Sequence, residues 1–241
     1  MLTKSDLTII IPAKNEERLL PNLLKSLALQ DYPAMSSTKL YIADAGSTDR
    51  TREVALSFSG RLNVEIIQGG LPAVGRNHGA RLASTRYLLF IDADIEIADS
   101  TLIRRTMEIA DRKNLHCATT NIACPEGKAW DRILYSGNNF MQHLSRLYRP
   151  FSTGMYMLFE RARFRALGGF HEQALYAEDY LLSQKVDRSR FRIIPGHVLT
   201  TNRRFRKMGH LRLVRLFLNT ALHTHNENFF LRDHKYWHSE A

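Results

Sequence analysis

Cysteine is scarce in this sequence. The 241 residues include only Cys117 and Cys124, and two cysteines at this spacing form neither a disulfide framework nor a zinc-binding pattern. We therefore expect a reducing compartment and predict a cytoplasmic protein. The N-terminus carries Lys4 and Asp6 before its first apolar run, and we consider this segment too short and too polar for a signal peptide.

Long hydrophobic runs, internal repeats and low-complexity linkers are also missing. No window approaches about 18 uninterrupted apolar residues, so we expect no membrane-spanning helix. Hydrophobic residues make up 44% of the chain and charged residues 24%, which is ordinary for a globular protein that buries a substantial core. The length favours one domain followed by a C-terminal extension.

Acidic residues are few relative to basic ones. The formal net charge is +10. Such an excess attracts nucleic acid, anionic membranes or phosphorylated small molecules, or it belongs only to a solvated basic face. The nucleic-acid interpretation lacks a recognition motif, so we expect no nucleic-acid partner. Much of the excess lies late in the chain, at Arg188, Arg190, Arg192, Arg203, Arg204, Arg206, Lys207, Arg212 and Arg215.

Strand and helix patterns alternate through the first half of the chain. Apolar and β-branched runs predict four buried strands, and a segment with helical features follows each of them. This alternation predicts an α/β fold with a Rossmann-like, mostly parallel sheet flanked by helices. The strands are expected at residues 7–12, 39–43, 63–67 and 87–91, and the helices near residues 18–20 onward, after Ser47 or Thr48, at 73–84 and at 101–112.

The second half is less regular. We expect extended segments at residues 116–122, 154–159 and 190–194, the last of them closed by Pro195-Gly196. Helices are expected at residues 128–148, 161–167 and 177–186, and the first of these is long and amphipathic.

The tail from Gly209 has the pattern of a basic amphipathic helix. Leu211, Val214, Leu218, Ala221 and Leu222 share one face, and Arg212, Arg215 and Asn219 lie on another. Such a helix suits an anionic membrane surface. It equally suits packing on the preceding domain or on a second copy of the chain, and the oligomeric state stays open.

Two carboxylates end the fourth predicted strand. Asp92 and Asp94 follow Tyr87–Ile91, and open α/β sheets bind ligands at the carboxyl edge of their strands. Hard oxygen ligands suit Mg²⁺ or Mn²⁺, and such an ion in turn suits a diphosphate. The Asp-x-Asp spacing alone is common by chance. The metal-site hypothesis, whose alternative is a solvated turn, therefore rests on the position of the two residues at the strand end.

Three polar residues near the same edge have open interpretations. Asp44 follows the second strand, and its carboxylate suits a ribose hydroxyl, a base N–H, or its own turn. Arg76 and Asn77 follow a glycine-rich turn, where they would reach phosphate or base. The alternative for Arg76 is an ordinary helix-surface arginine.

Two charged segments later in the chain also have two interpretations each. Glu178-Asp179 begins a helix, where the dipole favours negative charge, and either carboxylate would also serve as a general base. Arg203-Arg204-Phe205 would clamp a diphosphate or an acceptor phosphate, or form only a surface turn.

Taken in order, these segments resemble family 2 glycosyltransferases of the GT-A fold over about residues 7–205. A dinucleotide-binding Rossmann domain is disfavoured because no G-x-G-x-x-G follows the first strand. The matching motifs are Ile11-Pro12-Ala13-Lys14-Asn15-Glu16-Glu17, Asp44-Ala45-Gly46-Ser47-Thr48-Asp49, Arg76-Asn77-x-Gly79, Asp92-Ala93-Asp94, Thr153-Gly154, Gly168-Gly169-Phe170 and Glu178-Asp179.

The resemblance implies an inverting transferase that moves a sugar from a nucleotide diphosphate, UDP more than GDP, to a hydroxyl or lipid-linked acceptor in glycan or cell-envelope polysaccharide assembly. It implies a GT-A domain over residues 1–205, with a nucleotide-binding half at 1–98 and an acceptor half at 99–205. A C-terminal helical extension at 206–241 would follow, and the protein would be cytoplasmic or peripheral on the inner face of the membrane.

The resemblance also implies roles for individual residues. Asp179 would be the catalytic base, with Glu178 beside it, and Asp94 with Asp92 would bind Mn²⁺ or Mg²⁺. Ala45 and Lys14 depart from the commoner family pattern, which leaves the nucleotide preference open. A nucleotide-sugar-binding protein of this fold without transferase activity is the alternative. The implied nucleotide-binding residues are Pro12, Ala13, Asn15, Glu16, Asp44, Arg76, Asn77, Asp92 and Ala93, and the implied diphosphate or acceptor contacts are Arg203 and Arg204.

Overall fold

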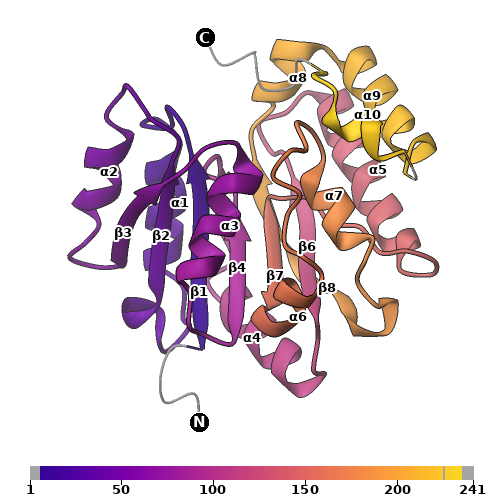
Figure 1. Cartoon of the computed structure of the whole chain (residues 1–241). Coiled ribbons are helices and arrows are strands. Elements are labelled where there is room, and N and C mark those ends of the chain that lie inside the picture. Colours follow the sequence, from indigo (N-terminus) through magenta and orange to yellow (C-terminus); the bar gives the residue numbers. More distant parts are fainter. Residues whose placement is uncertain (1–5, 225, 235–241) are drawn as a thin grey trace.

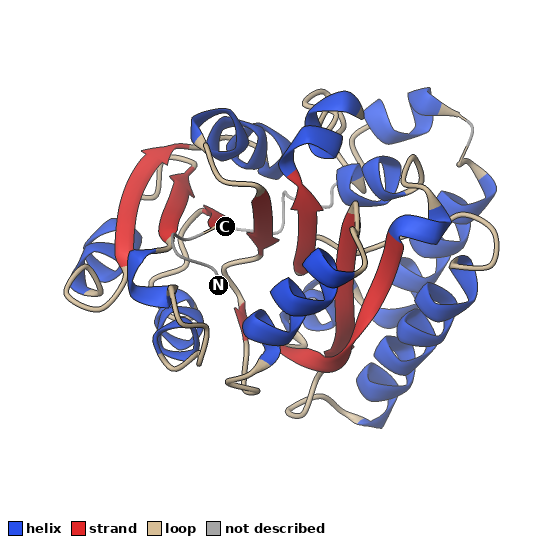
Figure 2. Cartoon of the chain, turned by 90° about the horizontal axis from the view of Figure 1, so that it is seen from below, coloured by secondary structure: helices blue, strands red, loops and turns tan. Residues whose placement is uncertain are grey.

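A computed structural model describes residues 6–224 and 226–234. One eight-stranded sheet runs through the molecule in the order β3-β2-β1-β4-β7-β6-β8-β5, with helices on both of its faces (Figures 1 and 2). The strands are β1 (Leu7–Ala13), β2 (Lys39–Asp44), β3 (Asn63–Gln68), β4 (Tyr87–Ile91), β5 (Ile95–Glu96), β6 (Cys117–Ala123), β7 (Tyr156–Glu160) and β8 (Phe191–Thr200).

The first four long strands form a parallel sheet, as predicted. β1 pairs in parallel with β2 and β4, and β2 pairs in parallel with β3. Alternate side chains of a strand point to opposite faces, so Ile9 and Ile11 join the core on one face while Ile10 joins the core on the other. Every residue of β4 is buried, which confirms the strand covered on both faces.

The remaining strands make the sheet mixed. β7 is antiparallel to both β4 and β6, β6 is parallel to β8, and β5 is antiparallel to β8. The two-residue strand β5 was not predicted, because a segment this short has no periodicity of its own.

The prediction that Pro195-Gly196 closes the last strand is wrong. β8 continues through both residues to Thr200. Ile194 lies opposite Thr120 and His197 lies opposite Asn121, so Pro195 and Gly196 are extra residues in a bulge. Proline is tolerated there because a bulge residue needs no N–H for the ladder.

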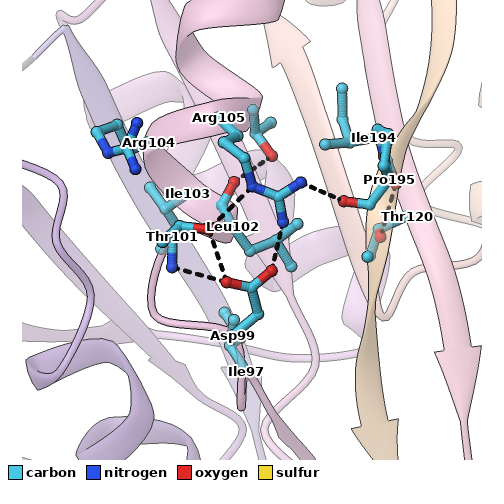
Figure 3. Close-up of polar contacts among 12 residues, drawn as sticks. Ile97, Asp99, Thr101, Leu102, Ile103, Arg104, Arg105, Thr120, Ile194 and Pro195 are labelled. Atoms are coloured by element: carbon cyan, nitrogen blue, oxygen red, sulfur yellow. Dashed lines mark hydrogen bonds and ion pairs between the residues drawn. The ribbon is translucent and has the colours of Figure 1, made fainter.

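An ion pair made by Arg105, on helix α4 (Leu102–Arg112), supports this bulge (Figure 3). The Arg105 Nη1 atom donates to the Pro195 carbonyl at 2.8 Å, and the same guanidinium pairs with Asp99. Asp99 also accepts hydrogen bonds from the Thr101 N–H at 2.9 Å and the Thr101 hydroxyl at 2.7 Å. The hydrogen bond from Arg105 joins residues 90 positions apart and stabilises the strand where Pro195 interrupts its ladder.

Helices cover both faces of the sheet, and most begin close to where the sequence predicts them. α2 is an exception, because Ser47 and Thr48 do not cap it. Their Oγ and N–H groups bond instead to Asn15, and the helix begins at Thr51. The helices are α1 (Leu20–Ala28), α2 (Thr51–Ser57), α3 (Pro72–Leu82), α4 (Leu102–Arg112), α5 (Ala129–Ser145), α6 (Arg161–Ala166), α7 (Glu178–Ser183), α8 (Arg203–Met208), α9 (His210–Leu222) and α10 (Glu227–Leu231), with 3-10 turns η1 (Met35–Ser37) and η2 (Arg188–Arg190).

Three helices, α8 to α10, follow β8 and pack near α5 and α7 (Figure 1). Their inner side chains, including Phe205, Leu213 and Phe230, form a small third core with Tyr176. The predicted apolar face of α9 points outward instead, since Leu211, Leu218 and Leu222 are exposed while Leu213 and Leu216 are buried.

Residues 235–241 of the predicted extension lie outside the described residues. No described helix is both long enough and apolar enough to cross a membrane.

Candidate active site

A cavity of about 520 Å³ lies at the carboxyl ends of β1 and β4. The segment before α3 closes one side of it, and α8 contributes two arginines from the far end of the chain. An adjoining hollow of about 470 Å³ shares Ala45 and Gly70 with the cavity and is lined by Asp44 and Arg52. The first cavity is lined by Pro12, Ala13, Lys14, Glu16, Ala45, Gly70, Leu71, Pro72, Asp92, Ala93, Asp94, Arg203 and Arg204.

The loops after β1 and β2 are held together by Asn15. This residue has a positive φ of 54°, which asparagine tolerates better than most residues. Its Oδ1 atom accepts the Thr48 N–H at 2.9 Å, and its own N–H donates to Ser47 Oγ at 3.0 Å. Asn15 does not line either cavity, so its visible role is to shape the loops that do.

Asp44 both bonds within its own turn and faces a hollow that could hold a ligand, the two interpretations that its sequence position left open. Its carboxylate accepts the Ser47 N–H at 3.2 Å and lies 3.7 Å from a guanidinium nitrogen of Arg52. It also lines the adjoining hollow at the end of β2. The turn bond therefore fixes the orientation of a carboxylate that still faces the ligand space.

Asp94 faces an arginine from α8. Arg203 Nη2 lies 3.2 Å from Asp94 Oδ2, and the same guanidinium makes a two-pronged pair with Glu16 at 2.6 and 3.1 Å. Burial and the nearby charge of Asp92 raise the pKa of Asp94, while Arg203 and Arg204 oppose that rise. Burial and the charge of Asp92 thus disfavour the ionised form of this carboxyl group.

The carboxylates at the end of β4 fit a divalent ion that is shared with a ligand. Within residues 6–224 and 226–234, no three His, Cys, Asp or Glu side chains are grouped to hold a metal by themselves. Mg²⁺ sites in nucleotide enzymes commonly use one or two carboxylates and take their other ligands from phosphates and water. Asp92 and Asp94 border the cavity and supply that minimal set.

Arg76 is buried, and its interpretation as a helix-surface arginine is wrong. Only 2% of its surface is exposed, and its two terminal nitrogens pair with Asp92 Oδ1 and Glu178 Oε1, each at 2.5 Å. Burial acts to lower the pKa of Arg76, but Asp92, Glu178 and Asp179 raise it beyond its ordinary value. The guanidinium therefore stays charged and ties the end of β4 to the start of α7.

Gly154 makes room for this arginine. A Cβ at that position would collide with Arg76 Nη2 and would also crowd Asp179. The glycine of the Thr153-Gly154 motif is thus explained by close packing, since any larger residue would displace the guanidinium.

The two neighbouring carboxylates of α7 have different surroundings. Glu178 is buried in its pair with Arg76. Asp179 is partly exposed and accepts the N–H groups of Gly154 at 2.5 Å and Tyr180 at 2.7 Å. Burial and the charge of Glu178 raise the pKa of Asp179 to about 7, against the lowering effect of Arg76 and the two N–H groups. The raised pKa suits the Asp179 carboxylate to accept a proton near neutral pH.

Asn77 holds the turn that precedes this region. Its side chain accepts the Phe170 N–H at 3.0 Å and donates to the Phe170 carbonyl at 2.8 Å. Gly169 in this turn has a φ of 69° and lies against the same amide, so a larger residue would not fit. Asn77 lines neither cavity, so its visible role is to hold the backbone at Phe170.

A comparison with known families decides what this arrangement belongs to. The profile described as "Glycosyl transferase family 2" matches residues 8–168, which is about two thirds of the chain. The chain belongs to glycosyltransferase family 2. In this family 2 chain the motifs that begin at Ile11, Asp44 and Asp92 lie at the ends of β1, β2 and β4, Arg76-Asn77-x-Gly79 lies within α3, and Glu178-Asp179 begins α7.

Relatives of known name match a little under two fifths of the chain. The poly(ribitol-phosphate) beta-N-acetylglucosaminyltransferase TarS of Staphylococcus aureus is 32% identical over 99 residues, which cover 39% of this chain and 17% of that protein. The validoxylamine A glucosyltransferase of Streptomyces hygroscopicus subsp. jinggangensis is 38% identical over 93 residues, or 37% of this chain and 22% of that protein. The matched regions thus make up about a fifth of these relatives.

Solved structures confirm the GT-A fold. TarS residues 1–349 in complex with UDP superimpose with a TM-score of 0.63 at 20% identity, covering 81% of this chain and 60% of that one. The mannosyltransferase PcManGT of Pyrobaculum calidifontis, solved with GDP-Man and Mn²⁺, gives a TM-score of 0.66 at 20% identity, covering 94% and 72%.

The family 2 chain brings most of the predicted site residues together. Pro12, Ala13, Glu16, Asp92, Ala93, Asp94, Arg203 and Arg204 line one cavity, and Asp44 lines the hollow beside it. Arg76 pairs with both Asp92 and Glu178, which brings the start of α7, with Asp179, to this edge. The pair between Glu16 and Arg203 was not predicted, because the two residues are 187 positions apart and no local pattern relates them.

Proposed function

We propose that this chain is a metal-dependent inverting glycosyltransferase. It would transfer a sugar from a nucleotide diphosphate sugar to an acceptor hydroxyl or a lipid-linked acceptor. The observation that carries the proposal is the ion-pair network in which Arg76 links Asp92, at the cavity, to Glu178, next to Asp179. This network puts a candidate metal site and a candidate base in one connected unit.

The donor nucleotide would occupy the two adjoining cavities. Pro12, Ala13, Glu16 and Asn15 shape the edge of the first cavity, and Asp44 offers a fixed carboxylate to a ribose hydroxyl or a base N–H. We favour UDP over GDP because TarS, a relative by sequence, was solved with UDP, whereas the neighbour solved with GDP-Man is similar in fold alone.

Asp94, with Asp92, would hold Mn²⁺ or Mg²⁺. When bound, such an ion neutralises charge on the departing diphosphate. Arg203 and Arg204 border the same cavity and would contact the diphosphate or an acceptor phosphate from α8. Guanidinium groups suit phosphate oxygens because their donors are planar and charged.

Asp179 would take the proton of the acceptor hydroxyl. The acceptor oxygen forms a bond to the anomeric carbon while the bond from that carbon to the phosphate oxygen breaks, and the bonding electrons leave with the diphosphate. Attack from the side opposite the leaving group inverts the anomeric centre. A pKa of about 7 suits a general base near neutral pH, and Glu178, fixed by Arg76, would position the acceptor.

The acceptor class follows from the relatives and not from the geometry. TarS is named for poly(ribitol-phosphate), so we propose a role in glycan or cell-envelope polysaccharide assembly. We also propose that the protein works in the cytoplasm, with contact to the inner face of the membrane.

Donor hydrolysis tests this function and separates it from a binding protein without turnover. We expect release of UDP from a UDP-sugar in the presence of Mn²⁺, loss of release with EDTA, and loss in Asp94→Ala. The control is Glu53→Ala, an exposed carboxylate on α2, which should behave as wild type. Nucleotide binding without metal-dependent release from any UDP- or GDP-sugar would overturn the proposal.

A further inference from the structure

The long helix α5 has its polar side chains on the inside. Asn139 exchanges hydrogen bonds with the backbone of Ile122 at 2.8 and 2.9 Å, and Gln142 Nε2 donates to the Thr120 carbonyl at 3.1 Å. These bonds serve β6 around the bulge, where its ladder with β8 is irregular. These polar residues occupy part of the inner face of α5, beside Leu134 and Tyr135, and its other large apolar residues lie on the outer face.

That outer face is a continuous apolar stripe. Trp130, Ile133, Phe140 and Leu144 recur at intervals of three, seven and four positions, which keeps them on one side of the helix. Trp130 is 68% exposed and Phe140 is 67% exposed. Exposed apolar patches of this kind mark interaction surfaces in soluble proteins. The stripe continues past the helix end, and further exposed apolar residues nearby are Met141, Leu147 and Tyr148.

α9 presents a second exposed stripe beside α5. Leu211 is 88% exposed and Leu222 is 79% exposed, with Leu218 between them. The two helices are neighbours in the upper right of Figure 1, and His210 Nε2 of α9 lies 2.6 Å from Asp131 Oδ1 of α5. The Tyr135 ring of α5 also packs 5.2 Å from the Phe205 ring of α8. The stripes therefore begin close together, at Trp130 and Leu211, whose chain neighbours Asp131 and His210 are in contact.

The charge of these segments identifies the partner. The chain has no Asp or Glu between Asp131 and Glu160, and none between Asp187 and Glu227. Apolar side chains bordered by cations and free of acidic residues match the boundary between anionic headgroups and acyl chains. A second copy of this chain fits less well, because a symmetric contact would bring two basic faces together. The exposed cations are Arg132, Arg149, Arg206, Lys207, Arg212 and Arg215.

We propose that the outer faces of α5 and α9 form a docking surface for a lipid membrane with anionic headgroups. The protein would lie on the bilayer with Trp130, Phe140 and Leu218 inserted at the headgroup boundary. The proposal does not depend on the transfer reaction, although it would bring a lipid-linked acceptor to the enzyme. It rests on the membrane contact in the proposed function but not on sugar transfer, so failure of vesicle binding and failure of donor turnover are separate results.

Vesicle co-sedimentation tests the docking surface. We expect binding to vesicles of equal parts phosphatidylcholine and phosphatidylglycerol, and little binding to phosphatidylcholine alone. The Phe140→Ser/Leu218→Ser variant should bind at least tenfold more weakly, because two exposed apolar anchors are lost. Leu29→Ser/Leu56→Ser, which removes two exposed leucines, one just after α1 and one on α2, is the matched control and should bind as wild type.

The charge contribution is tested separately. Arg132→Gln/Arg215→Gln removes one exposed cation from each helix and should weaken binding about 25-fold at low salt, since each basic residue near an anionic surface contributes about fivefold. Lys25→Gln/Arg61→Gln, with exposed cations elsewhere, is the control. High salt should reduce the difference because it screens exposed charges.

Three results would overturn the proposal. In the first, the wild type does not bind anionic vesicles. In the second, the Phe140→Ser/Leu218→Ser and Arg132→Gln/Arg215→Gln variants bind vesicles as well as the wild type. In the third, these variants keep vesicle binding but lose a dimer or oligonucleotide binding. UDP binding by calorimetry should be equal in wild type and all four surface variants, which shows that each variant is folded.

Discussion

At the scale of single residues, the neighbouring carboxylates Glu178 and Asp179 have the same chemistry but different partners. Glu178 is fixed in a buried pair with Arg76, whereas Asp179 accepts the backbone N–H groups of Gly154 and Tyr180 and has a pKa raised to about 7. The difference could not be predicted from the Glu-Asp dipeptide. It depends on Arg76, which comes from α3, about a hundred positions earlier.

The raised pKa of Asp179 predicts the pH dependence of transfer. Below about pH 7 the carboxyl group is protonated and cannot accept a proton, so kcat/KM should rise with pH through that value. Asp179→Asn should lose this pH dependence and lower the transfer rate by about 10²- to 10⁴-fold. Initial rates from acidic to alkaline pH check both effects, with UDP binding as the control. Near-wild-type transfer by Asp179→Asn would contradict the assignment.

Arg76 should be essential for stability as well as for the site. Arg76→Met leaves Asp92 and Glu178 without their shared cation, and breaking a buried pair in this way costs about 3–5 kcal/mol of unfolding free energy. Urea denaturation measures this loss.

The neighbouring Arg81→Met is the control for this prediction. Arg81 lies on the same helix and makes an exposed pair with Glu172, so its loss should cost about 0–1 kcal/mol. Equal effects of the two substitutions would show that the buried network is not stabilising.

At the scale of elements, β8 shows how a strand crosses residues that would normally end it. The bulge absorbs Pro195 and Gly196, and α4 supplies a donor for the exposed carbonyl of the bulge. The sequence pattern predicted the strand start but not its continuation, because the compensating contact comes from another element.

Arg105→Ala should destabilise this crossing. It removes the donor to the Pro195 carbonyl and the partner of Asp99, and we expect a loss of about 1–2 kcal/mol in unfolding free energy. Arg104→Ala is the control, since the adjacent arginine pairs only with carboxylates that are themselves exposed, Asp31 and Glu108. Urea denaturation of both variants measures the difference. A larger loss for Arg104→Ala would contradict the role given to Arg105.

At the scale of the whole molecule, the donor should stabilise the fold by bridging its distant parts. The cavity is lined by residues from 12 to 204, so a nucleotide bound there would contact segments far apart in the chain. UDP with Mn²⁺ at about a hundred times its Kd should add about 2.7 kcal/mol, which raises Tm by roughly 5–10 °C for a chain of this size.

Thermal shift experiments check this expectation. GDP with Mn²⁺ should give a smaller shift, and EDTA should remove most of the shift with UDP. Asp94→Ala provides the second comparison, because it lacks the carboxylate proposed to hold the ion. A larger shift with GDP would reverse the nucleotide preference without affecting the family assignment.

The sequence by itself determined the features that depend on local backbone and periodicity. Alternating apolar runs predicted the parallel strands β1 to β4, and the buried run Tyr87–Ile91 placed Asp92 and Asp94 at the carboxyl edge of the sheet. These patterns are readable because strand pleating and helical repeat act within a few residues. The ordered motifs predicted the family, which the comparison confirmed.

Only the tertiary structure decided which charges meet. It buried Arg76 between Asp92 and Glu178, paired Glu16 with Arg203, carried β8 past Pro195, and turned the apolar stripe of α5 outward. Each of these depends on elements distant in sequence, and the polar residues on the inner face of α5 serve the irregular ladder of β6. Such contacts follow from sheet order and bulges, which no local window of the sequence contains.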